Sequence, residues 1–189
     1  MRRITLDIET TSAASGIMDP AAMELSLIGI HDSSTGLFDS FLKEDLPRLW
    51  PILESADMLV GYNSDHFDIP ILNRYYSGDL ARVRSIDLLS EIRNSLGRRL
   101  KLDSVAQATL GIGKSGSGLD AVKWWAEGDV EKVRKYCLMD VAITKDIYEY
   151  ALKNGFVYYS DFGEKKKIPL DTSKWETGVK ASLTHTLPF

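Results

Sequence analysis

The chain has 189 residues, of which 44% are hydrophobic and 26% charged, with a net charge of −4; this fits one globular domain and excludes a disordered chain. No apolar run approaches the ~20 residues that span a bilayer, and an acid interrupts the N-terminal stretch where an export signal needs apolar residues. The single cysteine, Cys137, excludes an internal disulfide framework, so we expect a soluble, cytoplasmic protein without a membrane partner.

The first predicted element is a strand over residues 2–10. Its apolar residues recur at every second position and point one way, whereas Asp7 and Glu9 point the other. Two carboxylates about 7 Å apart on one strand face repel each other unless a cation lies near them. The alternative is an exposed strand face on which both acids are solvated.

A hairpin follows, with strands at residues 25–31 and 37–41. A continuous apolar strand at residues 58–60 then leads through a polar loop into a helix at residues 69–76. Asp68 stands at the start of this helix, where the helix dipole favours a carboxylate. The alternative is that Asp68 only stabilises the start of the helix and has no further function.

The middle of the chain is expected to contain a short strand and three helices, at residues 84–88, 88–96, 102–110 and 121–126. A glycine-rich loop at residues 111–118 includes a formal G-x-G-x-x-G sequence. It follows a helical pattern and not a strand, which argues against a dinucleotide site. Lys114 in this loop is a candidate for a place near a phosphate.

Residues 129–154 predict one long helix, which Asp129 can cap and Gly155 can end. Its buried face is expected to consist of Val133, Cys137, Val141, Ile143 and Ile147. Tyr136 and Asp140 are four residues apart and share a stripe beside that face. A carboxylate there needs a metal ion or a salt bridge as partner. Residues 156–160 and 168–170 predict a terminal β-hairpin around residues 161–167.

The order of strands and helices indicates an α/β domain. Asp7, Glu9, Asp68 and Asp140 would offer hard oxygen ligands without histidine, which suits Mg²⁺ or Mn²⁺. Two such ions would clamp the attacking and leaving oxygens of a phosphodiester. They would also offset the negative charge that otherwise disfavours nucleic acid.

Three short segments together resemble the motifs of the DEDDy 3′–5′ exonucleases, above all the proofreading exonuclease domain of family B DNA polymerases. In order, they are Asp7-Ile8-Glu9-Thr10, then Gly61-Tyr62-Asn63 with Phe67-Asp68, and Tyr136-Cys137-Leu138-Met139-Asp140. Two intervening segments resemble the same domain: Ile86-Asp87-Leu88-Leu89 and Lys101-Leu102-Asp103-Ser104-Val105-Ala106. The resemblance covers roughly residues 1–150.

The resemblance implies a ribonuclease H-like fold, with a mixed β-sheet flanked by helices and a C-terminal β-hairpin, and hydrolysis with two divalent metal ions. By this likeness Asp7 bridges both ions, Glu9 and Asp140 hold the one that activates water, and Asp68 holds the other. Tyr136 is implied to orient the water. Substrate contacts are expected at Thr10, Asn63 and Phe67.

We therefore expect a 3′–5′ exonuclease that removes nucleoside 5′-monophosphates from single-stranded 3′ ends, with DNA favoured over RNA. Residues 1–155 would form the exonuclease domain, and residues 156–189 a hairpin and tail within the same domain. No polymerase domain follows, so a separate polymerase or repair protein is a candidate partner. The alternatives are an RNA-trimming 3′–5′ exoribonuclease and a non-catalytic nucleic-acid-binding module on the same fold.

Overall fold

The computed structural model describes residues 1–12, 23–113 and 116–177. Lys114, which the sequence suggested as a phosphate neighbour, lies outside these residues. Within the described ranges, no helix combines the length and the apolar character that a membrane span requires.

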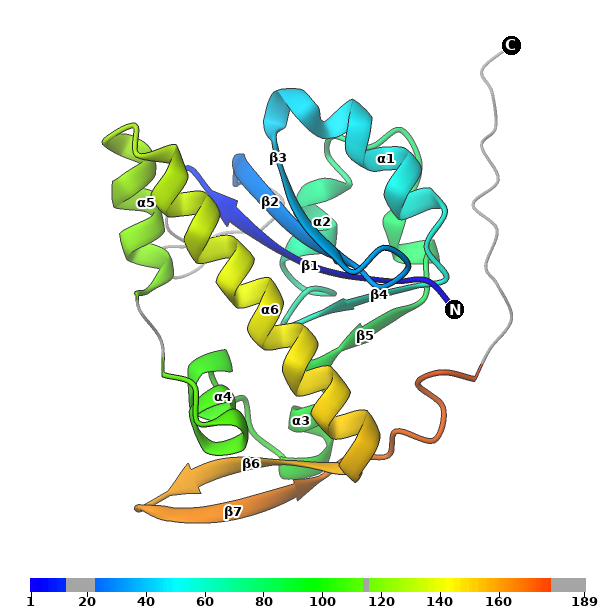
Figure 1. Cartoon of the computed structure of the whole chain (residues 1–189), viewed down its shortest axis with the longest axis vertical. Helices are drawn as coiled ribbons and strands as arrows, with labels where there is room; N and C mark the ends of the chain where they lie inside the picture. The colour runs from blue at the N-terminus through cyan, green and yellow to red at the C-terminus, as the bar shows by residue number, and fades with distance from the viewer. Residues whose placement is uncertain (13–22, 114–115, 178–189) are drawn as a thin grey trace.

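A five-stranded mixed sheet forms the centre of the molecule, in the order β3-β2-β1-β4-β5 (Figure 1). The strands are β1 (Arg3–Thr10), β2 (Leu25–Asp32), β3 (Leu37–Leu42), β4 (Met58–Gly61) and β5 (Ser85–Asp87). Strand β1 pairs antiparallel with β2 and parallel with β4. Since β1 is central, its apolar side chains are buried, and the expectation of an α/β fold with a mixed sheet is confirmed.

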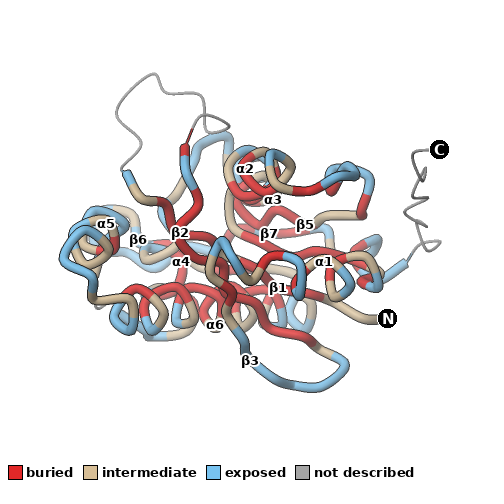
Figure 2. Tube along the Cα trace, turned by 90° about the horizontal axis from the view of Figure 1, so that it is seen from above, coloured by how far each residue is buried: buried red, intermediate tan, exposed pale blue. Residues whose placement is uncertain are grey.

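The helices cover both faces of this sheet. They are α1 (Leu46–Glu54), α2 (Asp68–Leu72), α3 (Leu88–Leu96), α4 (Leu102–Leu110), α5 (Gly118–Ala126) and α6 (Val130–Asn154), with 3-10 turns at Lys43–Asp45 and Leu80–Arg82. One core cluster joins α1 and α2 to the side of β1 that carries Ile4, Leu6 and Ile8. Helix α6 crosses the other side of the sheet (Figure 1), and its buried stripe packs there (Figure 2).

Helix α6 has the ends that the sequence predicts. The side chain of Asp129 accepts a hydrogen bond from the backbone N–H of Lys132, and Gly155 ends the helix with φ 74°. All five residues of the predicted apolar face are buried. The helix therefore presents a fixed face to β1 and β2 along its first half.

The bounds of two helices differ most from the prediction. Helix α2 ends at Leu72, because the backbone bonds tighten there to the i→i−3 type: the N–H of Arg74 donates to the carbonyl of Ile71, and that of Tyr75 to the carbonyl of Leu72. Helix α5 begins at Gly118 and not at residue 121, because Ser117 and Asp120 form a capping box.

The terminal hairpin is longer than predicted, with strands β6 (Phe156–Asp161) and β7 (Glu164–Pro169). Only Phe162 and Gly163 form the turn, both with positive φ, so the run of three lysines lies in a strand and not in a loop. The buried side chains of Val157 and Ile168 join the core cluster that contains α3, α4 and the end of α6. The C-terminal hairpin expected from the fold class is thus present.

Candidate active site

A cleft of about 430 Å³ opens where the C-terminal end of β1 meets α5, α6 and the loop between β4 and α2. It collects every residue of the predicted site except Asn63. These residues are Asp7, Glu9, Thr10, Phe67, Asp68, Tyr136 and Asp140. Three separate segments of the chain therefore bring these residues to one concave surface.

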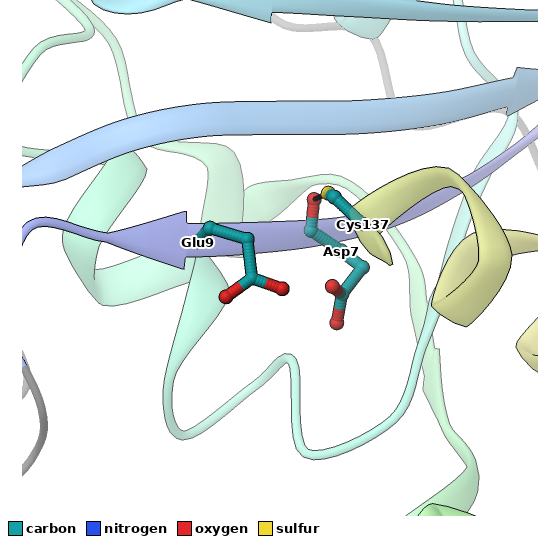
Figure 3. A group of neighbouring side chains, drawn as sticks. All are labelled: Asp7, Glu9 and Cys137. Atoms are coloured by element: carbon teal, nitrogen blue, oxygen red, sulfur yellow. Dashed lines mark hydrogen bonds between the residues drawn. The ribbon is translucent and has the colours of Figure 1, made fainter. Parts of the chain in front are cut away.

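Strand β1 supplies two of the carboxylates. Asp7 lies opposite Gly29 of β2 and Glu9 lies opposite Leu27, so alternation along the strand places both side chains on one face. Figure 3 shows both carboxylates on the same side of β1. Asp7 is half-buried and Glu9 is buried, which rules out the alternative of two fully solvated acids.

Cys137 lies next to Asp7 and Glu9, although a thiol is not a preferred ligand of a hard divalent cation. One ligand atom of each of Asp7, Glu9 and Cys137 lies within 4.8 Å of the others. The Cys137 Sγ donates to the backbone carbonyl of Asp7 at 3.2 Å (Figure 3). Burial raises the pKa of the thiol, and the neighbouring carboxylates raise it further. A neutral thiol suits the small core residue that the sequence predicts.

Helix α6 brings Tyr136 and Asp140 to the same place because it packs unusually close to β2. A Cβ atom on Gly29 would lie 2.9 Å from Cys137 Sγ and 3.2 Å from a methyl carbon of Val141. Only glycine leaves room for the helix at this point. Sequence reasoning missed Gly29, whose signal is a single glycine inside a strand.

The phenol of Tyr136 keeps its proton at neutral pH. Burial raises its pKa most, and the negative charges of Asp140, Glu9 and Asp7 raise it further. Tyr136 lines the same cleft as these three carboxylates. Tyr136 can therefore donate a hydrogen bond within the cleft.

Asp68 reaches the cleft from the first turn of α2. Only 3% of the residue is exposed, and its Oδ1 accepts the backbone N–H of Ile8 at 3.0 Å. Burial raises the pKa of this carboxyl to about 7, against the effect of two backbone hydrogen bonds, while Asp87 and Asp65 raise it further. The ionised form is unfavourable here unless positive charge accompanies it.

The loop between β4 and α2 is held by close packing and by Asp87. A Cβ atom on Gly61 would lie 2.3 Å from the Cβ of Ser64, so a side chain at residue 61 would clash with the loop. The Asp87 carboxylate accepts the backbone N–H groups of Asn63 and Asp65, and also caps α3. Sequence analysis noted Asp87 only as part of the resemblance, although its place before a helix signals a cap.

Asn63 lies beside the cleft and not in it. Its φ of 69° turns the loop, and its side chain lines two adjoining pockets. The side-chain oxygen of Asn63 accepts a hydrogen bond from Arg99 at 2.7 Å. The cleft itself includes residues of α5 that sequence reasoning did not anticipate, Gly118, Leu119 and Val122.

The donor set fits hard divalent cations. Asp7 and Glu9 converge with oxygen ligands, as Mg²⁺ and Mn²⁺ prefer. Asp68 and Asp140 line the same cleft outside that tight group. A cation in the cleft would offset the charges that raise the pKa values of Tyr136 and Asp68.

The sheet, its helices and this acidic cleft define the class of protein, a ribonuclease H-like α/β domain. A family model described as the RNase_H superfamily matches residues 4–152, and the chain belongs to that superfamily. This membership supports a nuclease-type function.

Solved structures agree on the fold, and 160 of their chains match. One is the family B DNA polymerase from the hyperthermophilic archaeon Pyrobaculum calidifontis, with 22% identity and a TM-score of 0.65. The match covers 80% of this chain and 24% of the polymerase chain, so this chain spans about a quarter of that protein. No curated protein matches the sequence.

Proposed function

We propose that the protein is a 3′–5′ exonuclease that removes nucleoside 5′-monophosphates from the 3′ end of single-stranded nucleic acid, with DNA favoured. One observation carries the proposal. Four carboxylates and a protonated tyrosine, from β1, α2 and α6, meet in one cleft: Asp7, Glu9, Asp68, Asp140 and Tyr136. A binding module has no need for this costly cluster of acids.

In this proposal Asp7, Glu9, Asp68 and Asp140 hold two divalent cations, Mg²⁺ or Mn²⁺. When bound, the cations offset the charge of the reacting phosphate and promote the ionisation of water. The four acids thereby turn a cleft that would repel a phosphate into one that accepts it.

Tyr136 orients the attacking water through its hydroxyl, which stays protonated because the surrounding carboxylates oppose its ionisation. The water oxygen bonds to phosphorus, the bond from phosphorus to the 3′ oxygen breaks, and that oxygen takes a proton. The products are a nucleoside 5′-monophosphate and a strand shortened by one residue. Thr10 and Phe67 line the cleft where the terminal nucleotide would lie.

The test is degradation of matched single-stranded DNA and RNA oligonucleotides, labelled at the 5′ or the 3′ end, with Mg²⁺, with Mn²⁺ and with chelator. We expect immediate release of labelled mononucleotide from the 3′ end with metal and none with chelator. The variant Asp7→Asn is the matched inactive control.

A closed circular single strand distinguishes the mode of attack. The proposal requires the circle to stay intact, and its cleavage would replace the exonuclease with an endonuclease. Faster degradation of RNA than of DNA would instead assign the enzyme to RNA trimming.

A further inference from the structure

The terminal hairpin of β6 and β7 has one face in the core and one face that points away from it. Val157 and Ile168 pair across the two strands and are buried against α3, α4 and α6. Side chains alternate along a strand, so their neighbours belong to the opposite face, which we call the outer face. The outer face carries Phe156, Tyr158, Ser160, Lys165, Lys167 and Pro169. It contains two basic residues and no acid.

Aromatic rings hold both lysines of the outer face. Lys165 Nζ lies 4.1 Å from the centre of the Tyr158 ring, and Lys167 Nζ lies 4.2 Å from the centre of the Phe156 ring. An ammonium is attracted to an aromatic ring at this distance. The two rings meet edge to face, with 5.2 Å between their centroids, and the ring of Tyr150 packs against both. A cluster of three rings therefore fixes the positions of the two charges.

The lysine between these two has the opposite arrangement. Lys166 belongs to the inner face, where its Nζ lies 2.8 Å from the carboxylate of Asp161 and 3.9 Å from that of Glu164. Among the residues that the structure describes, no carboxylate forms an ion pair with Lys165 or Lys167. The positive charge of the outer face is thus not compensated within this part of the chain, and such a face attracts a polyanion.

The turn at the tip of the hairpin carries a residue that the fold itself does not favour. Phe162 is fully exposed and has φ 49°, and Gly163 follows with φ 84°. A turn with two positive φ values favours Asn-Gly, because a bulky side chain is strained there. Neither burial nor backbone geometry accounts for an aromatic residue at this position, whereas contact with a ligand would.

The hairpin is remote from the active-site cleft. Tyr150 lies fourteen residues after Tyr136 on α6, which is about 21 Å farther along the helix. Figure 1 shows the hairpin at the end of α6 that lies away from α5 and from the C-terminal end of β1. The hairpin also lies beyond residues 4–152, which the family model matches. A ligand on the outer face would therefore make contacts that are distinct from those in the cleft.

The geometry of the outer face favours a DNA duplex over other nucleic acids. Proteins bind a single strand by stacking its bases on open aromatic faces, but here an ammonium lies over the Tyr158 ring and another over the Phe156 ring. A DNA duplex exposes its phosphates, and its major groove admits a two-stranded β-ribbon. The major groove of an RNA duplex is too narrow for side chains to read.

We propose that the outer face and the tip of the terminal hairpin bind double-stranded DNA. Lys165 and Lys167 contact its phosphates, and Phe162 contacts the groove. Phosphate contacts carry no sequence information, so the binding is independent of sequence. This inference goes beyond the proposed exonuclease function, because the hairpin binds a duplex whether or not the cleft cleaves a strand.

Fluorescence anisotropy with a labelled blunt DNA duplex tests the proposal. The full-length protein is titrated in chelator, and Lys165→Ala/Lys167→Ala is compared with Lys166→Ala, the matched control from the inner face. The double variant should bind the duplex at least about tenfold more weakly at ~0.1 M salt, and the slope of log affinity against log salt should fall by about 1.8. Lys166→Ala should change both quantities much less. Equal losses in the two variants would overturn the proposal.

Two further variants separate binding from folding. Lys165→Arg/Lys167→Arg keeps both charges and should retain the salt slope of the wild type. Phe162→Asn should bind the duplex more weakly while its Tm equals or exceeds that of the wild type, because asparagine suits a positive φ. Wild-type affinity in Phe162→Asn, or a lower Tm, would overturn the assignment of the tip.

Other ligands and the activity complete the test. A loss of affinity in Lys165→Ala/Lys167→Ala that is as large for single-stranded DNA or for an RNA duplex would overturn the choice of a DNA duplex. Displacement of the duplex by polyglutamate at an equal concentration of charge would reassign the face to an acidic protein. Release of mononucleotides from octathymidylate with Mn²⁺ should be the same in all hairpin variants as in the wild type. An active wild type that binds no duplex would refute the hairpin alone, and duplex binding without activity would refute the exonuclease alone.

Discussion

Replacing Asp68 by asparagine should stabilise the metal-free protein at neutral and alkaline pH. Asp68→Asn removes a buried charge, and its amide oxygen can still accept the N–H of Ile8. The pKa of the carboxyl rises from an ordinary 3.8 to about 7 in the folded chain. Each pKa unit corresponds to about 1.4 kcal/mol, so the ionised carboxylate costs the fold at most about 4 kcal/mol. Recovering all of that free energy would raise Tm by roughly 8–16 °C for a chain of this size.

The sign of the pH dependence follows from the same two pKa values. Below about pH 4 the carboxyl is protonated in both the folded and the unfolded chain, and it costs nothing. As the pH rises from about 4 to about 7, the unfolded chain ionises first, so the wild type loses stability. The advantage of Asp68→Asn should therefore be full above about pH 7 and should disappear towards pH 4.

Thermal melts in chelator, at about pH 8 and about pH 4, measure this effect. Asp39→Asn is the matched control, because it removes the same charge at an exposed position of β3 that does not act on the pKa of Asp68. A titration with Mn²⁺ should then stabilise the wild type more than Asp68→Asn. If Asp68→Asn melts below the wild type at both pH values, the carboxylate is a structural acceptor for the Ile8 N–H, and the electrostatic reasoning is refuted.

Three further substitutions test other parts of the site. Tyr136→Phe should slow hydrolysis by about 10²–10⁴-fold while metal-induced stabilisation stays as in the wild type; an unchanged single-turnover rate would remove the hydroxyl from the mechanism. Asp140→Asn should abolish activity, raise Tm in chelator and reduce the gain in Tm from Mn²⁺; a lower Tm with a normal metal response would make Asp140 a structural acid. Gly29→Ala should lower the free energy of unfolding in urea by about 1–3 kcal/mol and lower activity, because a Cβ atom 2.9 Å from Cys137 Sγ displaces α6. Gly118→Ala is its control for stability, because a Cβ atom there meets nothing within 4 Å. Equal stability of the two variants would contradict the close packing.

The sequence correctly predicted the bounds of those helices whose ends depend only on nearby residues. Helices α3 and α4 have the predicted bounds, and α6 begins and ends at its predicted cap and glycine. Periodicity and caps act within a few residues, so the sequence contains these signals in full. The family and its mixed sheet could also be predicted from the sequence, because three short motifs in the right order are specific when they occur together.

The bounds of elements that depend on distant partners could not be predicted from the sequence. The hairpin gains length because Val157 and Ile168 complete a core with α3, α4 and α6. Here partners from other segments decide the local structure.

The sequence by itself singled out the candidate site residues, namely the acids and the tyrosine that the resemblance implies. Only the tertiary structure decided their arrangement: Gly29 lets α6 approach β1, so that Tyr136 and Asp140 line the cleft with Asp7 and Glu9. It also placed Asn63 beside the cleft, where its side-chain oxygen accepts a hydrogen bond from Arg99. The physical reason is that electrostatic and packing energies depend on distances in space, and periodicity along the chain sets those distances only within one element.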